Sequence, residues 1–371
     1  MKYSIIILNY NVKFFTAACL QTVQKAVQNK DAEIIVADNA STDGSKEYLS
    51  KFKNVKFLWF SQNLGFAKAY NKAVQQAKGK YLLILNPDTL VSEDILEQLS
   101  QFVRQKPRIG IVGGKMIDGT GQFLPESKRG IPTPLTAFGK ITGCYKILNF
   151  PPFNAYYAPY LKSNQTGKVP VLTGAFMFLT KETYLSVGGF DERYFMYGED
   201  IDFSYTVLKS GKENYYYHKA KIIHFKGESS QKDSRYLINF YQTTFQFYKK
   251  HFQIYPFLEF ATKQILKIWL KIRQLKSANP KKISYTHTLF VGKKTHYTHI
   301  LKHYAQAQYH EQIPSTISSQ TLIIFDTSVL NFSDIIQTME KHQAGYRFYF
   351  PELKILIGSD YKDQVGTVIH I

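Results

Sequence analysis

The sequence predicts an α/β protein in which a mostly parallel sheet is followed by a basic helical segment and a smaller α/β domain. Three observations support this fold class. Strand-like and helix-like segments alternate through the first 116 residues. The strands are short continuous apolar runs, such as YSIIIL and KYLLIL, which are typical of a sheet covered on both faces. A chain of 371 residues also exceeds the usual size of one domain.

The first part of the chain follows a strand–helix rhythm. We expect strands at 3–8, 32–38, 54–60, 80–85 and 109–116, separated by helices at 13–28, 43–52, 66–77 and 93–105. Segment 117–168 is rich in Pro, Gly, Asn and aromatic residues and has little periodicity, which predicts an excursion that is either flexible or faces the substrate. Periodic structure resumes with 169–180, a loop at 188–200, a helix to about 209 and a strand at 220–225.

The second part of the chain begins with two expected helices, 231–252 and 254–275, and a linker at 277–282. Strands and helices then alternate again, at 286–292, 296–308, 320–326, 333–342, 346–350 and 353–358. We therefore predict three regions, namely a domain over 1–230, a basic helical segment over 231–280 and a small α/β domain over 281–371.

Composition limits the class of protein. Hydrophobic residues make up 44% of the chain and aromatic residues 15%, which favours packed cores over disorder. The two cysteines, Cys19 and Cys144, form no disulfide framework or metal-ligand pattern, so a reducing compartment is expected. The opening MKYSIIILNY lacks a signal-peptide pattern, and no run of roughly 18 uncharged apolar residues occurs. These features favour a cytoplasmic location.

The net charge of +19 is concentrated in one stretch. Residues 241–310 hold twelve Lys and Arg against one acid, which leaves +11. Within 254–275, Lys263, Lys267 and Lys271 repeat every fourth residue opposite an apolar face that contains Trp269. Such a helix is typical of a peripheral protein on an anionic membrane surface, although packing on the protein's own core is the alternative. No nucleic-acid-binding motif accompanies the charge, so no nucleic acid partner is expected.

Polar side chains follow four strands of the predicted sheet: NYN at 9–11, DNAST at 38–42, SQNLGF at 61–66 and NPDT at 86–89. Because ligands bind outside the carboxyl ends of parallel strands, we expect these segments to converge on one binding edge. The first strand is not followed by Gly-x-Gly-x-x-Gly, which argues against a dinucleotide-binding domain.

Several of these residues suit the chemistry of a nucleotide and a cation. Asp38 could accept the N3–H of a uracil or thymine ring on which Tyr10 stacks, or it could simply form a turn. Asp88 follows Pro87, and a hard cation such as Mg²⁺ or Mn²⁺ can bind through one carboxylate and substrate phosphates, although a plain turn is the alternative.

Two further segments carry candidate groups. GED at 198–200 opens a helix, where its acids either complement the helix dipole or supply a general base. His224 closes a strand and becomes a candidate metal ligand only if the fold brings it to Asp88.

The order and spacing of these motifs resemble glycosyltransferase family 2, a family with the GT-A, Rossmann-like fold, and within it the rhamnosyltransferase-like bacterial members. The resemblance runs from residue 3 to about 230 and rests on seven ordered matches: SIIILNYN, IIVADNASTDGS, NLGFAKAYN, YLLILNPDT, GIVGGKM, the block LTGAFMFLTKETYLSVGGFDERYFMYGEDIDFSYTVLKSG, and IIHFKGESS. The block over 172–211 is the most specific of them.

The resemblance implies a role for each matching residue. Asp200 would be the general base, with Glu199 beside it. Asp88 would be the second acid of the family's metal motif, whose first acid is Asn86 here, and His224 matches a histidine that joins the metal in some members. The residues implied to hold the nucleotide-sugar are Asn9, Tyr10, Asp38, Asn39, Asp43, Asn63, Gly65, Asn86, Asp88, Gly174 and Ala175.

The expected function is therefore inverting transfer of a sugar, with rhamnose among the candidates, from a UDP- or dTDP-sugar to a growing, lipid-linked cell-surface glycan. The enzyme would need Mg²⁺ or Mn²⁺ and would lie on the inner face of the plasma membrane. Two alternatives remain at this point. One is a sugar-1-phosphate nucleotidyltransferase, which would need a Gly-rich loop where NYNVKFF stands. The other is a non-catalytic protein that binds glycans or polyanions.

Overall fold

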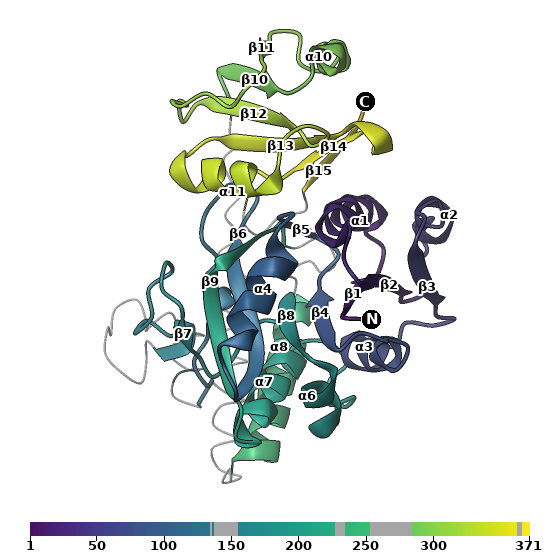
Figure 1. Cartoon of the computed structure of the whole chain (residues 1–371), viewed down its shortest axis with the longest axis vertical. Helices are drawn as coiled ribbons and strands as arrows, with labels where there is room; N and C mark the ends of the chain where they lie inside the picture. The colour runs from purple at the N-terminus through teal and green to yellow at the C-terminus, as the bar shows by residue number, and fades with distance from the viewer. Residues whose placement is uncertain (134–135, 137–154, 227–233, 253–283, 362–365) are drawn as a thin grey trace.

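The computed structural model describes residues 1–133, 136, 155–226, 234–252, 284–361 and 366–371. The helix expected at 254–275, which would carry the three repeated lysines, lies outside the described residues. The described chain forms two sheets, each with its own helices, and the second sheet sits at one end of the molecule (Figure 1).

The first sheet has the strand order β3-β2-β1-β4-β8-β6-β9-β5, with β7 paired to β9. Its strands are β1 (Tyr3–Asn9), β2 (Ala32–Asp38), β3 (Val55–Trp59), β4 (Tyr81–Leu85), β5 (Thr89–Val91), β6 (Ile109–Ile117), β7 (Gly167–Lys168), β8 (Phe176–Thr180) and β9 (Glu213–His224). Strands β1 to β4 pair in parallel, which confirms the expected α/β class and brings their carboxyl ends to one edge. Strand β8 then runs antiparallel to both β4 and β6.

The helices of this part alternate with the strands along the chain. They are α1 (Lys13–Val27), α2 (Ser45–Leu49), α3 (Phe66–Gln75), α4 (Ile95–Arg104), α6 (Lys181–Ser186), α7 (Glu199–Lys209) and α8 (Ser234–His251). Short 3₁₀ turns occur at Pro125–Ser127 and Ala155–Tyr157. All four helices expected within the first 105 residues are present, so the periodicity of the sequence located them correctly.

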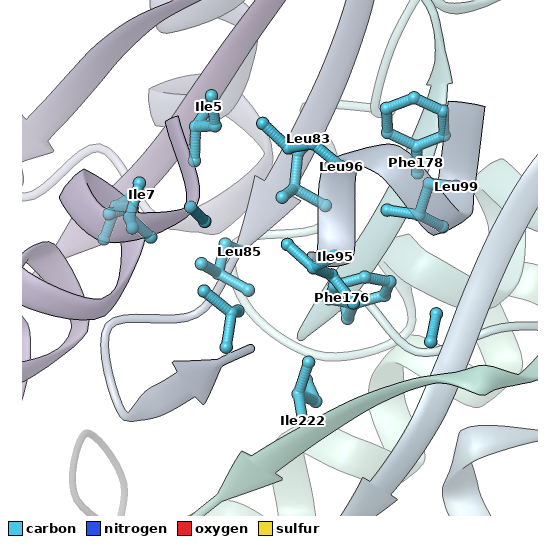
Figure 2. Close-up of a cluster of buried hydrophobic side chains, with 14 of the residues drawn as sticks. Ile5, Ile7, Leu83, Leu85, Ile95, Leu96, Leu99, Phe176, Phe178 and Ile222 are labelled. Carbon is cyan, nitrogen blue, oxygen red and sulfur yellow. The ribbon is translucent and has the colours of Figure 1, made fainter. Parts of the chain in front are cut away.

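Both faces of the parallel strands are buried, which explains their continuous apolar sequence. Ile5 and Ile7 of β1 enter one hydrophobic cluster, whereas Ile6 and Leu8 enter another on the opposite face. Figure 2 shows the first cluster, in which β1 and β4 pack against helix α4 and strand β8. Helix α4 presents an apolar stripe to it through Ile95, Leu96, Leu99, Phe102 and Val103.

The second sheet has the order β11-β10-β12-β13-β14-β15. Its elements are β10 (His287–Val291), α10 (Lys294–Leu301), β11 (Gln308–His310), β12 (Thr321–Asp326), α11 (Phe332–Lys341), β13 (Gly345–Phe350), a 3₁₀ turn (Pro351–Leu353), β14 (Ile355–Gly358) and β15 (Thr367–His370). Strands β10 to β13 pair in parallel, and β14 and β15 add antiparallel. This matches the small α/β unit expected at the end of the chain.

Several elements differ from the sequence prediction: α6, β7 and β15 were not expected, and three further differences have identifiable causes. The helix expected at 296–308 ends at Leu301, because the chain turns and pairs residues 308–310 with β10 as strand β11. The strand expected at 220–225 starts at Glu213, since the tyrosines of ENYYYHKA extend it along β6. The chain also re-enters the sheet directly after NPDT as β5, which the prediction omitted.

The two sheets share a hydrophobic cluster. Phe15, Ile117 and Phe225 of the first part pack with Phe348 and Met339 of the second. Phe225 and Phe348 meet edge to face with ring centroids 5.6 Å apart. Because the cluster is continuous, the second part packs directly against one end of the first sheet.

A half-buried carboxylate joins the two parts electrostatically. Glu340 of α11 lies 2.5 Å from Lys115 of β6 and 2.5 Å from Lys221 of β9. Burial raises the pKa of Glu340, but the hydrogen bonds and charges of the two lysines outweigh it and hold the pKa below the usual range. The ion pair therefore stabilises the contact of α11 with the sheet.

Replacing this carboxylate should destabilise the protein. We expect Glu340→Gln to lower the free energy of unfolding in urea by about 2 kcal/mol at pH 7, because Lys115 keeps a charge without its partner. The difference from wild type should shrink as the pH falls below the range of an ordinary glutamate, since the lowered pKa contributes stability only while the carboxylate is ionised. The control Glu352→Gln alters an exposed contact with Gln21 and should shift stability by less than about 0.5 kcal/mol. Equal effects of the two variants would contradict the assignment.

Candidate active site

The loops after β1 and β2 are held together by their own side chains. Asn9 donates from Nδ2 to Asp38 Oδ2 at 2.7 Å and to Ser41 Oγ at 3.1 Å. The backbone N–H of Ser41 donates to Asp38 Oδ1 at 2.9 Å. A carboxylate has about four acceptor positions, so Asp38 keeps capacity for an N–H of a ligand. The carboxylate expected to bind a pyrimidine ring is thus buried, fixed and still able to accept.

Tyr10 belongs to the first of these loops, directly after β1, and is half-buried. The next residue, Asn11, adopts φ 56° and accepts the N–H of Thr42 at 2.7 Å, which fixes the backbone around Tyr10. Among the described residues no aromatic ring packs against the ring of Tyr10. This arrangement is compatible with the stacking role expected for it.

Asn39 connects the second loop to the third. It donates from Nδ2 to Asn63 Oδ1 at 2.8 Å and to the carbonyl of Gly65 at 3.2 Å. Gly65 adopts φ 76°, and a Cβ there would lie 2.4 Å from the carbonyl oxygen of Phe195. The donor-side residues Asn39, Asn63 and Gly65 therefore form one unit, on which the loop before α7 is packed. Asp43 accepts the N–H of Lys13 at 3.1 Å and so fixes the start of α1.

The turn Asn86–Pro87–Asp88 brings Asp88 to His224. After the turn the chain forms β5, which pairs antiparallel with β9 so that Thr89 lies opposite His224. Asp88 Oδ1 and His224 Nε2 are 3.2 Å apart, and both side chains are more than nine-tenths buried. The fold thus meets the condition under which His224 becomes a candidate metal ligand.

The chemistry of this pair fits a divalent cation. In the part of the chain that the structure describes, neither Asp88 Oδ1 nor His224 Nδ1 has a hydrogen-bond partner. Two neighbouring ligands of an octahedral cation, each at about 2.1 Å, lie about 3 Å apart, which is close to the observed separation. Asn86 stands at the turn but contributes backbone contacts, since its N–H donates to Ala175 at 3.0 Å. The described residues contain no group of three or more His, Cys, Asp or Glu side chains arranged to hold a metal, so a cation here would need ligand oxygens from the donor.

Asp200 is held by three donors at the start of α7. Arg129 donates from Nη2 to Asp200 Oδ2 at 2.6 Å, the N–H of Gly174 donates to the same oxygen at 3.1 Å, and the N–H of Ile201 donates to Oδ1 at 2.8 Å. The carboxylate is 14% exposed and so remains reachable. A candidate base with its orientation fixed in this way is suited to accept a proton from a bound hydroxyl.

Gly174 and Ala175 join the Asp88 turn to Asp200. The carbonyl of Ala175 accepts the N–H of Asn86, and the N–H of Gly174 reaches Asp200. A Cβ at Gly174 would lie 3.1 Å from the ring of Phe66 and 3.3 Å from Cβ of Asp200, so little more than glycine fits. The candidate cation ligand and the candidate base therefore lie on one continuous rim.

Glu199 and Asp202 differ in their surroundings. Burial and the charge of Asp200 raise the pKa of Glu199 to about 8, so its carboxyl is largely protonated at neutral pH. Asp202 faces the other side of α7, where it binds Lys250 at 2.7 Å and His251 at 2.7 Å. Asp202 thus anchors α8 and is separate from the site.

Two contacts of the site were missed by the sequence analysis. Arg129, the partner of Asp200, is the single arginine of the aperiodic segment 117–168, and that was the only sign of its importance. Glu126 of the same segment pairs with Lys226, two residues after His224. Burial raises the pKa of Glu126, but the charge and hydrogen bond of Lys226 lower it to about 2, with a smaller contribution from His224.

Comparison with known proteins supports the class that this geometry suggests. Residues 4–184 match the profile described as "Glycosyl transferase family 2". The chain is 28% identical over 220 residues to N-acetylglucosaminyl-diphospho-decaprenol L-rhamnosyltransferase of Mycobacterium tuberculosis, which covers 55% of this chain and 70% of that protein. It is 25% identical over 228 residues to rhamnosyltransferase WbbL of Escherichia coli, covering 55% and 78%. Among solved structures, GalNAc-T7 with UDP, GalNAc and Mn²⁺ aligns with 18% identity and a TM-score of 0.48, over 66% of this chain and 47% of that one.

Strands β1 to β4 are parallel, and polar residues and carboxylates lie at their carboxyl ends. Together with the profile match, this arrangement identifies a glycosyltransferase of the GT-A fold. More narrowly, residues 4–184 match the profile of glycosyltransferase family 2, and the chain is similar to two rhamnosyltransferases. The resemblance that the motifs indicated is therefore confirmed.

The raised pKa of Glu199 leads to a test by stability. Between pH 4.5 and about 8 the folded protein binds a proton at Glu199 that the unfolded chain has lost, so wild-type stability falls as the pH rises. Glu199→Gln removes this dependence and should be more stable than wild type by on the order of 1 kcal/mol for each pH unit across that interval. Urea unfolding at several pH values measures it, with exposed Glu182→Gln as the control. Parallel curves for wild type and Glu199→Gln would refute the assignment.

Proposed function

We propose that this chain is a metal-dependent, inverting glycosyltransferase that moves a sugar from a UDP- or dTDP-sugar to a hydroxyl of a lipid-linked glycan. The observation that carries the proposal is that the candidate cation site and the candidate base lie on one rim. Asp88 Oδ1 lies 3.2 Å from His224 Nε2 and has no hydrogen-bond partner among the described residues, and residues 174–175 connect the Asp88 turn to Asp200. A cation site and a base fixed on one rim are what displacement at an anomeric carbon requires.

The donor would be bound by the first three loops. Asp38 would accept the N3–H of the pyrimidine, Tyr10 would stack on the ring, and the Asn39–Asn63–Gly65 unit would line the donor side. Asp88 and His224 would hold Mg²⁺ or Mn²⁺ together with the donor diphosphate. When bound, such a cation supplies positive charge against the charge that develops on the departing nucleoside diphosphate.

The transfer step would use Asp200. The acceptor hydroxyl loses its proton to the Asp200 carboxylate while its oxygen bonds to the anomeric carbon and the bond to the diphosphate breaks. Arg129 and the N–H of Gly174 keep the carboxylate in one orientation through this step. A single base with no carboxylate nucleophile gives one displacement, which inverts the configuration of the sugar.

The acceptor and sugar are inferred from the relatives. The mycobacterial relative is named for an L-rhamnosyl transfer to a decaprenol-linked N-acetylglucosaminyl diphosphate. Rhamnose transfer to a polyprenyl-diphosphate-linked glycan is accordingly the specific form of the proposal. Within the described residues, no helix has the length and apolar character needed to cross a bilayer. We therefore propose peripheral attachment to the inner face of the plasma membrane through the basic sequence around 254–275.

A donor screen tests the proposed chemistry. We expect release of nucleoside diphosphate from a UDP- or dTDP-sugar, and not from GDP-sugars, in the presence of Mn²⁺ or Mg²⁺ and not in EDTA. Asp200→Asn should retain donor binding by calorimetry but lose turnover by about 10³-fold or more, because the base is removed and the donor loops are untouched. The exposed Glu182→Gln serves as the matched control.

Three outcomes of the screen would contradict the proposal. Full turnover by Asp200→Asn would remove Asp200 as base. Formation of a nucleoside triphosphate from pyrophosphate and the donor would identify a nucleotidyltransferase instead. Donor binding without any turnover, unchanged in Asp200→Asn, would indicate a non-catalytic binding protein.

Sedimentation with anionic liposomes tests the membrane partner. Changing Lys263, Lys267 and Lys271 to Gln should weaken binding roughly 100-fold, since each lysine near an anionic surface contributes about 1 kcal/mol. Lys51, Lys53 and Lys78 are exposed elsewhere, and the same change there should leave binding close to wild type. Equal binding by both triple variants would refute a role for this helix.

A further inference from the structure

The second sheet has a topological switch point of its own. From β10 the chain passes through α10 to β11 on one side, and it then crosses to β12 on the other side of β10. All three strands are parallel, so the connections that leave the carboxyl ends of β10 and β12 diverge. In open α/β sheets this divergence leaves a crevice in which ligands bind.

A cavity of about 990 Å³ lies at this point. It is lined by the loop after β10, the segment after β11, the loop after β12 and one face of α11. We call it the β10–β12 crevice. Its volume is at the upper end of the range typical of sites for small molecules and cofactors. None of the residues expected to bind the nucleotide-sugar lines it, so it is separate from the candidate active site.

Three lysines line the crevice. Lys293 and Lys294 follow β10, and Lys341 comes from α11. None of these lysines makes an ion pair with the residues that the structure describes. The crevice also contains two acids, Glu311 and Asp334, so the lysines outnumber them. Lysines without partners at the rim of a concave site attract an anionic ligand.

Backbone groups add to this attraction. The N–H groups of Lys294 and Thr295 begin helix α10 and meet no acceptor in the described part of the chain, so they are available to a ligand anion. The N–H of Lys293 is already used, since it donates to Asp326 Oδ2 at 3.1 Å. The ring of His296 donates to the same carboxylate, with Nδ1 2.8 Å from the oxygen. Asp326 is fully buried, and these donors together with Ser328 satisfy its carboxylate.

The crevice also has an apolar wall. Ile313, Val329 and Leu330 line it together with the ring of Tyr309. Val329 is 45% exposed and is one of five large apolar side chains exposed among the described residues. An exposed apolar wall next to a cluster of lysines suits a ligand that carries both an organic ring and an anionic group.

We propose that the β10–β12 crevice binds a small molecule that carries a phosphate group on a ring-containing body, as in a nucleotide or a sugar phosphate. The phosphate lies between Lys293, Lys294 and the first N–H groups of α10, and the body of the ligand lies against Val329 and Tyr309. This is a second ligand site of the chain. It does not depend on the function proposed for the first.

Calorimetry on the full chain tests the site. The probes are AMP, glucose 1-phosphate and inorganic phosphate, each without divalent cations. We expect at least one organic phosphate to bind the wild type with a Kd below about 1 mM and more tightly than inorganic phosphate, because only an organic phosphate reaches the apolar wall. Preference for AMP or for glucose 1-phosphate identifies which class of body the crevice takes.

Two variants and two controls locate the binding. The double variant Lys293→Glu/Lys294→Glu should weaken binding at least tenfold, and acids at a helix N-terminus leave α10 stable. Val329→Trp places a larger side chain on the apolar wall without changing the charge. It should also weaken binding at least tenfold. Lys302→Glu changes a lysine at the other end of α10 and should bind as wild type, and so should Asp38→Ala, which alters the candidate active site.

The proposal is overturned if no organic phosphate binds below about 1 mM. It is also overturned if the double variant and Val329→Trp bind as wild type, or if Lys302→Glu weakens binding as much as the double variant does. Loss of binding in Asp38→Ala alone would assign the ligand to the first site instead. Circular dichroism of each variant verifies that the fold is retained, so a loss of binding is not a loss of structure.

Discussion

The antiparallel pairing of β5 with β9 is the constraint on which the candidate active site depends. Three residues of β5 pair with the end of β9, and this short ladder sets Asp88 against His224. The N–H of Phe225 also donates to the carbonyl of Asp88 at 3.0 Å, which closes the turn. A shift of one residue would turn His224 to the other face of the sheet, because neighbouring side chains of a strand point in opposite directions. The strength of a cation site here therefore rests on backbone hydrogen bonds as much as on its ligands.

The parts of the fold that the sequence predicted are those where local pattern and tertiary role agree. Strands such as YLLIL are buried on both faces, so their composition and their position in a parallel sheet carry the same information, and the polar residues at their ends mark the binding edge. Strand β5 could not be predicted in this way. Its three residues are too few for a period, and only pairing with β9 makes TLV a strand. The role of Arg129 could not be predicted for a related reason. Its partner Asp200 is distant in sequence, and the sequence around Arg129 has no regular pattern.

The charges around Asp200 combine stabilising and destabilising contacts. Arg129 and Asp200 compensate one another in a buried pair, whereas Glu199 next to them has a buried oxygen without a hydrogen-bond partner among the described residues. Keeping a carboxyl in such a place costs stability, and groups with a strongly altered pKa concentrate at functional sites. The neighbours of Glu199 at the start of α7 thus set its pKa. On the other side of the helix, the ion pairs of Asp202 with Lys250 and His251 hold α7 against α8.

The shared cluster between the two sheets bears on how this chain and its relatives diverged. The curated rhamnosyltransferase relatives align with little more than half of this chain. Any homologue without the second sheet must place polar residues where Phe15, Ile117 and Phe225 stand, or cover them with another element, because an open apolar patch of this kind promotes aggregation. The second sheet is consequently part of the hydrophobic packing of the first, and deleting it from this chain would uncover these three side chains.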